Sequence, residues 1–219
     1  MFPLRDSQQS ERPPFVTSVL ILLNVAAFFY QLSLSEFELT EFMMRNGTVP
    51  ARFAWETLFT SMFLHGGWMH LIGNMWFLWV FGDNIEDILG HANYLVFYLA
   101  CGLAGGIGHV LLNANSVVPA IGASGAISGV MGAYLMKFPA SRVTTLVFFI
   151  MTVEVPALLM IGWWFVTQLF SGLGSLASAN PQAGGTAWFA HIGGFIAGCI
   201  LIQAMPTKPR WRVRRDHGW

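Results

Sequence analysis

The sequence predicts an all-α polytopic membrane protein, a bundle of six transmembrane helices of which the fourth is short. Hydrophobic residues make up 55% of its 219 residues and charged residues only 10%, whereas about 25% of the residues of soluble domains are charged. So few charged residues cannot cover the surface of a soluble domain. Disorder and nucleic-acid binding both need abundant polar or charged residues, so this composition excludes them as well. We therefore expect the protein to lie in a lipid bilayer and to bind no nucleic acid.

Six apolar segments provide these helices, each close to the roughly 20 residues that cross a bilayer. In order they are residues 15–34, 58–82, 93–112, 123–136, 154–170 and 187–205. The fifth is expected to begin near Glu154, because Pro156 suits the first turn of a helix. Residues 143–153 would then be a short apolar piece at the membrane interface.

Most of the charge lies outside these segments. We expect a cytoplasmic N-terminal segment at 1–14, the six-helix core at 15–205 and a basic cytoplasmic tail at 206–219. With the N-terminus in the cytoplasm, only Arg45 and Arg52 of the 11 basic residues fall on the outer side. Because cytoplasmic loops are enriched in Lys and Arg, this distribution predicts that both termini are cytoplasmic.

The second segment contains His65, His70 and Asn74, of which His70 and Asn74 are four positions apart. In hydrocarbon a polar side chain is costly unless it faces the protein interior or a water-filled cavity. Four-residue spacing places both side chains on one helix face, where both can donate hydrogen bonds to a developing oxyanion. The alternative is a hydrogen-bonded pair that holds two helices together.

Ser124 opens the short fourth segment, between Gly122 and Gly125. A nucleophile at the start of a helix has an exposed oxygen, and the N–H groups of the first turn remain free for an oxyanion. The glycines allow a second helix and a substrate backbone to come close. Gly125 and Gly129 equally fit a helix contact made by small residues, so the motif by itself leaves both interpretations open.

His191 lies about one turn inside the outer end of the sixth segment, at a depth similar to that of Ser124. A serine hydroxyl is a poor nucleophile until a neighbouring imidazole takes its proton. The fourth and sixth segments contain no carboxylate that could orient the imidazole, so the sequence supports a Ser–His dyad. His109 in the third segment is interpreted as an interhelical histidine, and we expect no metal ion or other cofactor, because no His-Glu-x-x-His pattern occurs.

Together these motifs resemble those of the rhomboid intramembrane serine proteases. The matching motifs are His70-x-x-x-Asn74, Gly122-x-Ser124-Gly125 and Ala190-His191-x-x-Gly194, in this order. Residues 81–90 look like the loop that follows the second span of that family. The resemblance covers about residues 15–205 and, as a combination of motifs, is highly specific.

The resemblance implies a role for each matching residue. Ser124 would be the nucleophile and His191 the general base. The side chains of His70 and Asn74 and the backbone N–H of Ser124 would form the oxyanion hole. His65 and Glu86 would be structural.

The resemblance also implies a substrate and a location. The family cleaves single-pass transmembrane proteins near the outer membrane face, at small residues beside a helix-destabilising stretch. The bacterial type is a multi-pass protein of the cytoplasmic membrane. Two positions depart from the family pattern: Trp55 is followed by Glu56 where members often have Arg, and Ser128 stands where many have an aromatic residue stacked on the histidine. Another side chain is therefore expected to hold the imidazole.

Two other classes of function are alternatives to a protease. An inactive rhomboid-like protein that binds or escorts membrane clients is expected to lack Ser124 or His191, and both are present. A transporter or channel usually has charged residues within the membrane and paired broken helices from internal repeats, and neither is evident in the sequence.

Overall fold

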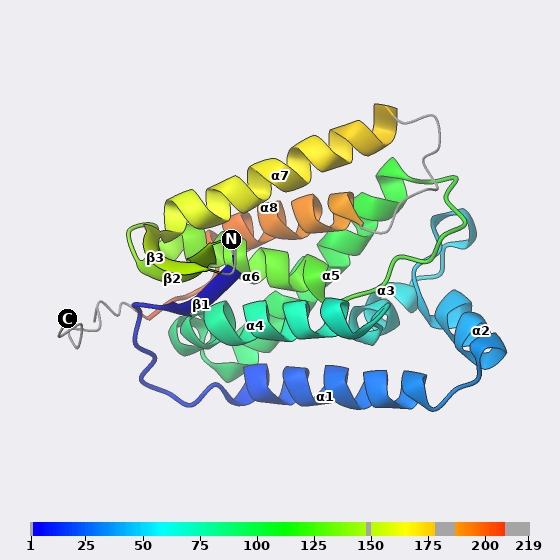
Figure 1. Ribbon diagram of the computed structural model, residues 1–219, viewed down its shortest axis with the longest axis horizontal. Coiled ribbons are helices and arrows are strands. Elements are labelled where there is room, and N and C mark those ends of the chain that lie inside the picture. The colour runs from blue at the N-terminus through cyan, green and yellow to red at the C-terminus, as the bar shows by residue number, and fades with distance from the viewer. Residues whose placement is uncertain (1, 148–149, 178–186, 209–219) are drawn as a thin grey trace.

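The computed structural model describes residues 2–147, 150–177 and 187–208 as a mostly helical chain (Figure 1). Its helices are α1 (Phe15–Leu32), α2 (Glu36–Asn46), α3 (Thr57–Thr60), α4 (Trp68–Leu89), α5 (His91–Leu112), α6 (Ser124–Lys137), α7 (Ala157–Ala177) and α8 (Trp188–Ala204), with 3-10 turns at Pro50–Arg52 and Ser61–Phe63. Its strands are β1 (Phe2–Asp6), β2 (Arg142–Val147) and β3 (Met151–Pro156).

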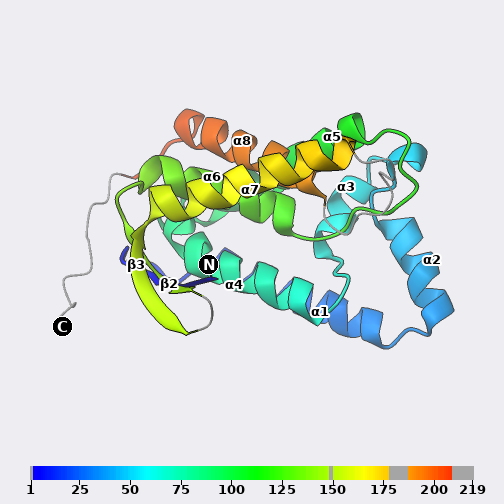
Figure 2. The ribbon, with the colours of Figure 1, turned by 45° about the horizontal axis from the view of Figure 1, so that its top comes forward.

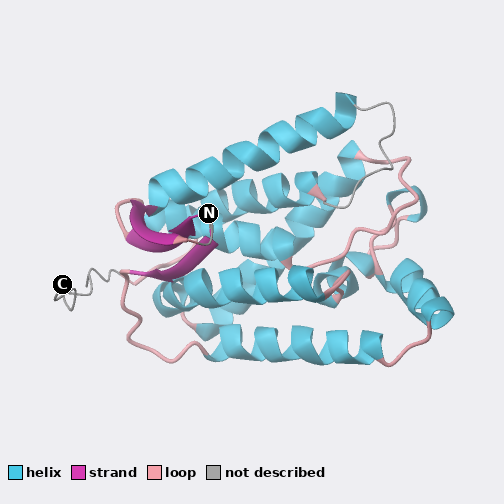
Figure 3. Cartoon of the chain, in the orientation of Figure 1, coloured by secondary structure: helices cyan, strands magenta, loops and turns pink. Residues whose placement is uncertain are grey.

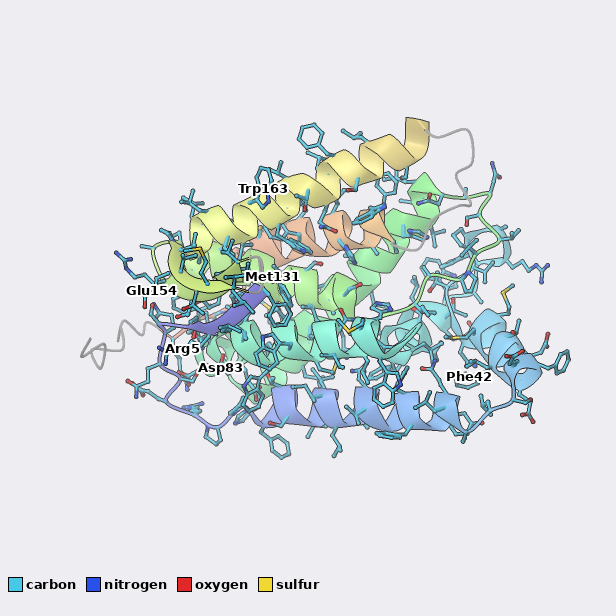
Figure 4. All side chains as sticks on the ribbon, in the orientation of Figure 1. Arg5, Phe42, Asp83, Met131, Glu154 and Trp163 are labelled. Carbon is cyan, nitrogen blue, oxygen red and sulfur yellow. The ribbon has the colours of Figure 1, made fainter. Side chains whose placement is uncertain are left out.

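The short helix α6 lies at the centre of the bundle, packed against α4, α5 and α8 (Figure 1). Every residue from 125 to 134 is buried, and Met131 lies in the middle of the bundle (Figure 4). A helix that is buried on all sides must be apolar or small on all sides, which explains why α6 combines glycine, alanine and aliphatic residues. The first residue of this helix is Ser124.

Glycines bring the backbones of α6 and α8 into contact. A Cβ added to Gly194 would lie 2.0 Å from the carbonyl oxygen of Gly125, and one added to Gly198 would lie 2.0 Å from that of Gly129. Only glycine leaves room for this approach. The start of α6 is therefore held directly against the first turns of α8.

Three of the described helices are long and apolar enough to cross a membrane: Phe15–Leu32, His91–Leu112 and Ala157–Ser175. The apolar helix α8 is shorter, with 17 residues, and α6 has only 14. The helix α4 has 22 residues but includes polar ones such as His70 and Asn74. By length and hydropathy alone, these three helices are thus the candidate membrane spans.

The all-α prediction is wrong in one respect, because a three-stranded antiparallel sheet in the order β1-β2-β3 lies at one end of the bundle (Figure 3). Residues 143–153, expected as an apolar interfacial piece, belong mainly to β2 and β3. This segment is rich in Val and Thr, whose branched side chains favour strands. In β2 the buried side chains of Val143 and Thr145 alternate with more exposed neighbours, as expected for a strand with one buried face.

The N-terminal strand β1 attaches this sheet to the bundle. The Phe2 ring lies 5.5 Å from the Trp76 ring of α4, measured between centroids. The Tyr134 hydroxyl donates to the Asp6 carboxylate. Figure 2 shows the sheet at the end of the bundle opposite α2. The backbone N–H of Lys208 donates to the carbonyl of Ile88 at that same end, and the remainder of the predicted tail, 209–219, lies outside the described residues.

The predicted start of the fifth helix also needs correction, since α7 begins at Ala157 rather than near Glu154. Glu154 is the strand partner of Thr144, and its carboxylate lies 3.8 Å from the Arg142 guanidinium. Pro156 ends β3. The proline thus precedes the helix and does not lie in its first turn.

The boundaries of the second predicted span, 58–82, are shifted in the structure. Helix α4 begins at Trp68 and continues to Leu89. Residues 58–67 instead form part of α3, a 3-10 turn and a loop that contains His65. The segment 81–90, expected as a loop, forms the last turns of α4 and ends at Gly90, whose φ of +76° reverses the chain into α5.

Candidate active site

Ser124 lies where a loop enters the bundle. The preceding Gly122 has a φ of +122°, a conformation open to glycine and strained for other residues. Its N–H donates to the carbonyl of Ser61 at 2.9 Å. Because Ser124 is the first residue of α6, its backbone N–H has no partner within that helix.

Ser124 and His191 are brought together from two helices. The Nε2 atom of His191 lies 2.8 Å from the Ser124 Oγ, although the residues are 67 positions apart. His191 lies in the first turns of α8 and is 9% exposed. The hydroxyl is therefore placed to donate its proton to the imidazole.

The other side of the imidazole contacts Gln168 of α7, a residue that sequence reasoning missed. The Oε1 of Gln168 lies 2.7 Å from the Nδ1 of His191. A carbonyl oxygen only accepts hydrogen bonds, so Nδ1 carries the proton and Nε2 is left as an acceptor. No orienting group was expected from the sequence because no carboxylate lies near His191, whereas the available signal was an amide in a mostly apolar helix.

Two tryptophans flank the same imidazole. The Trp164 ring lies 5.9 Å from it at an interplanar angle of 33°, and the Trp188 ring lies 6.2 Å away at 87°. Ser128 does not reach it through its hydroxyl, which bonds back to the Ser124 carbonyl at 2.6 Å. The aromatic side chains beside the histidine thus come from α7 and α8 and not from α6.

His70 and Asn74 face the loop that leads to Ser124. A Cβ on Gly122 would lie 2.8 Å from the Nε2 of His70 and 3.5 Å from the Nδ2 of Asn74. The N–H of Gly66 donates to the Nδ1 of His70 at 3.3 Å, which leaves Nε2 as the protonated nitrogen of a neutral ring. Both side chains therefore present N–H groups beside this loop.

His65 contacts Asn74 from the loop before α4. Its Nε2 lies 2.9 Å from the Asn74 Nδ2, so the amide can donate to it. The Gln31 side chain accepts from the backbone N–H of His65 at 3.1 Å and donates to its carbonyl at 2.9 Å. The His65 backbone is thus held by Gln31, its side chain is buried at 1% exposure, and its Nε2 orients the Asn74 amide.

Glu86 lies at the other end of α4, about 24 Å from His70 at 1.5 Å per residue. Its carboxylate accepts hydrogen bonds from the N–H groups of Val16 and Thr17 at 2.7 and 2.8 Å. The Nδ1 of His91 lies 2.6 Å away. Glu86 therefore fastens the start of α1 to the end of α4.

A cavity of about 30 Å³ lies beside Ser124, and Thr48, Ser61 and His109 line it. A space of this size and polarity has room for a water molecule. The Nδ1 of His109 lies 3.4 Å from the Asn113 amide of its own helix. The prediction of an interhelical histidine therefore gives way to a residue that faces a cavity and contacts its own helix.

The sequence of this chain is similar to that of a known protein family. The family model of the Rhomboid domain matches residues 52–206 of this chain. The chain belongs to the rhomboid family. The rhomboid domain thus covers every element that contributes to the Ser124–His191 pair and its neighbours.

Rhomboid relatives occur in bacteria and in mitochondria. The chain is 30% identical to Rhomboid protease GluP of Bacillus subtilis over 90% of this chain and 36% of the relative. It is 29% identical to Rhomboid protein 1, mitochondrial, of Saccharomyces cerevisiae over 94% and 59%. It is 31% identical to RHOMBOID-like protein 6, mitochondrial, of Arabidopsis thaliana over 73% and 47%. The chain spans less than two thirds of the length of each of these relatives.

Membership in the rhomboid family and the apolar helices identify this chain as an integral membrane protein. Relatives named rhomboid proteases support a hydrolase.

Proposed function

We propose that this rhomboid protein is an intramembrane serine endopeptidase that cleaves single-pass membrane proteins near the outer membrane face. The contact of 2.8 Å between the Ser124 Oγ and the His191 Nε2 carries this proposal. A serine hydroxyl bonded to an imidazole acceptor is the arrangement that activates a serine nucleophile. In this proposal no metal ion or other cofactor takes part.

In the first half of the reaction His191 is the general base. As the Ser124 Oγ bonds to the scissile carbonyl carbon, its proton moves to the His191 Nε2 and the carbonyl oxygen becomes an oxyanion. The C–N bond then breaks, and the imidazolium gives the proton to the departing amine. The product of this half is an ester between Ser124 and the N-terminal part of the substrate.

Water completes the cycle. His191 takes a proton from a water molecule as the water oxygen attacks the ester carbonyl, and returns it to the Ser124 Oγ as the ester C–O bond breaks. The cavity beside Ser124 has room for such a water, which supports hydrolysis within an otherwise apolar bundle.

Three donors are proposed for the oxyanion: the Ser124 backbone N–H, the His70 Nε2–H and the Asn74 amide. The position of both side chains against Gly122 supports this assignment. Fixed donors aimed at developing charge stabilise the transition state more than the substrate. Gly122 and Gly125 leave room for a substrate backbone on one side of Ser124 and for α8 on the other.

The short length of α6 supports cleavage within the membrane. Its 14 residues span about 21 Å at 1.5 Å per residue, less than the hydrocarbon thickness of about 30 Å. If the end of α6 at Lys137 lies at the cytoplasmic surface, Ser124 lies below the outer one. A cut near the outer face follows from this depth.

We further propose six spans, formed by α1, α4, α5, α6, α7 and α8, with both termini in the cytoplasm of a bacterium. The core would be 15–205, flanked by cytoplasmic segments 1–14 and 206–219. The distribution of basic residues supports this orientation. The sheet end of the bundle contains Arg5 of β1, Lys137 at the end of α6 and Arg142 of β2, and α2 at the opposite end contains Arg45 (Figure 1).

The experiment is cleavage of a single-span reporter by the purified protein in liposomes, with mass spectrometry of the products. We expect Ser124→Ala and His191→Ala each to abolish cleavage while still inserting, and a fluorophosphonate to label the wild type but not Ser124→Ala. Cleavage that survives Ser124→Ala would contradict the proposal. A wild type that binds the reporter but neither cleaves it nor reacts with the fluorophosphonate would instead be an escort of membrane clients.

A further inference from the structure

Gln168 connects α7 to the imidazole of His191. Its Oε1 lies 2.7 Å from Nδ1, and its side chain is only 7% exposed. We propose that Gln168 is a positioning residue that keeps His191 in the tautomer able to accept the Ser124 proton. This role rests on the proposed protease function and adds a third member to the Ser–His pair.

The hydrogen bonds of the amide fix which of its atoms faces His191. The Nε2 of Gln168 donates to the Thr167 hydroxyl at 3.2 Å and to the Trp164 carbonyl at 3.4 Å. The Thr167 hydroxyl itself donates to that same carbonyl at 2.6 Å, so its oxygen is left as the acceptor. With the NH₂ group directed to its own helix, Gln168 presents the Oε1 to His191.

This orientation has a chemical consequence for His191. A neutral imidazole has one N–H, and the Oε1 of Gln168 can bond only to a protonated Nδ1. The other nitrogen, Nε2, is then the free acceptor that lies 2.8 Å from the Ser124 Oγ. With the proton on Nε2, the ring could not take the proton of Ser124.

An amide suits this position because it carries no charge. A carboxylate buried among apolar helices costs much more free energy than an amide that makes its hydrogen bonds. The Nδ1–H bond to Gln168 also persists when His191 becomes an imidazolium during the reaction. Gln168 thus holds the ring through both protonation states without a buried negative charge.

The test compares Gln168→Leu, which removes the acceptor, with Gln168→Glu, which keeps an acceptor oxygen. For reporter cleavage in liposomes we expect Gln168→Leu to lower kcat about 10- to 100-fold, the range for a buried donor left without its partner, with KM changed less than about twofold. Gln168→Glu should have a kcat clearly above that of Gln168→Leu and within about tenfold of the wild type. The matched control is Gln203→Leu, which changes an exposed glutamine of α8 and should leave both constants unchanged.

A second measurement needs no variant of Gln168. The ¹⁵N chemical shifts of the His191 ring in the wild type, assigned with His191→Ala, should show a proton on Nδ1 and none on Nε2 at neutral pH. A proton on Nε2 would overturn the positioning role. So would a Gln168→Leu protein with the kcat of the wild type, or a Gln168→Glu protein as slow as Gln168→Leu. Failure of the wild type to cleave contradicts the proposed function, whereas the ring tautomer tests Gln168 alone.

Discussion

Gly194 of α8 lies against Gly125 of α6 so closely that a Cβ on Gly194 would be 2.0 Å from the Gly125 carbonyl oxygen. Since Gly125 follows Ser124 and Gly194 lies three residues after His191, this contact sets the separation of the two helices at Ser124 and His191. Side chains do not intervene at this point, so the backbones determine the distance between the hydroxyl and the imidazole.

Gly194→Ala is expected to lower the stability of the fold and to slow cleavage. The added methyl group would push α8 from α6, and overpacking of this kind costs about 1–3 kcal/mol. Thermal unfolding in detergent and reporter cleavage measure the two effects. Gly162→Ala is the control, because a Cβ at Gly162 of α7 meets nothing within 4 Å. Equal stability and activity of the two variants would contradict the close contact.

Asn74→Ala should lower kcat about 10²- to 10³-fold, the usual cost of removing one oxyanion donor. The Asn74 amide lies beside Gly122 and is oriented by His65. Steady-state cleavage kinetics provide the measurement. Asn93→Ala, which removes an exposed amide at the start of α5, should have the kinetics of the wild type. A loss limited to KM would assign Asn74 to substrate binding rather than to the transition state.

Trp164→Ala should lower kcat about tenfold, because the imidazole would lose the ring that lies 5.9 Å from it and aromatic pairs contribute about 0.5–1.5 kcal/mol. The neighbouring Trp163 offers a matched control, since it lies on the same helix (Figure 4) but is 61% exposed. Trp163→Ala should retain the kcat of the wild type. The prediction fails if the two substitutions have the same effect on kcat.

Glu86→Ala should destabilise the protein by about 1–3 kcal/mol, since it leaves the N–H groups of Val16 and Thr17 without their acceptor. Unfolding in detergent, followed by circular dichroism, measures this loss. Glu36→Ala, in the exposed first turn of α2, should have little effect. At a temperature where Glu86→Ala remains folded, its rate of fluorophosphonate labelling should equal that of the wild type, because Glu86 lies far from Ser124.

Ser124 and His191 could be singled out as candidates from the sequence, because each lies in a glycine-rich motif at a helix start, and their catalytic roles stay a prediction. The structure brings Ser124 and His191 within 2.8 Å and turns His70 and Asn74 toward Gly122. Gln168 could not be predicted in the same way. Its contact with His191 depends on how α7 is rotated against α8, which no local pattern determines.

The sheet and the start of α4 could not be predicted from the sequence, each for a different reason. Residues 142–156 are both apolar and β-branched, so their composition fits an interfacial piece as well as a strand. Their pairing with β1 joins segments more than 130 residues apart in the chain, which local propensity cannot reveal. The apolar composition that begins at Leu58 continues without a break into α4. Hydropathy alone therefore does not separate the 3-10 turn at Ser61–Phe63 from the helix.

The imidazole of His191 draws its neighbours from helices that are anchored very differently. Ser124 belongs to α6, whose backbone is locked to that of α8, whereas Gln168 and Trp164 belong to α7, which packs against α8 through side chains such as Phe165 on Phe195. A sideways displacement of α7 would therefore leave the hydroxyl and Trp188 beside the imidazole and withdraw Gln168 and Trp164 from it. If a substrate of the proposed protease enters past α7, entry and readiness to cut it are mutually exclusive states, and cleavage waits until the helix has returned.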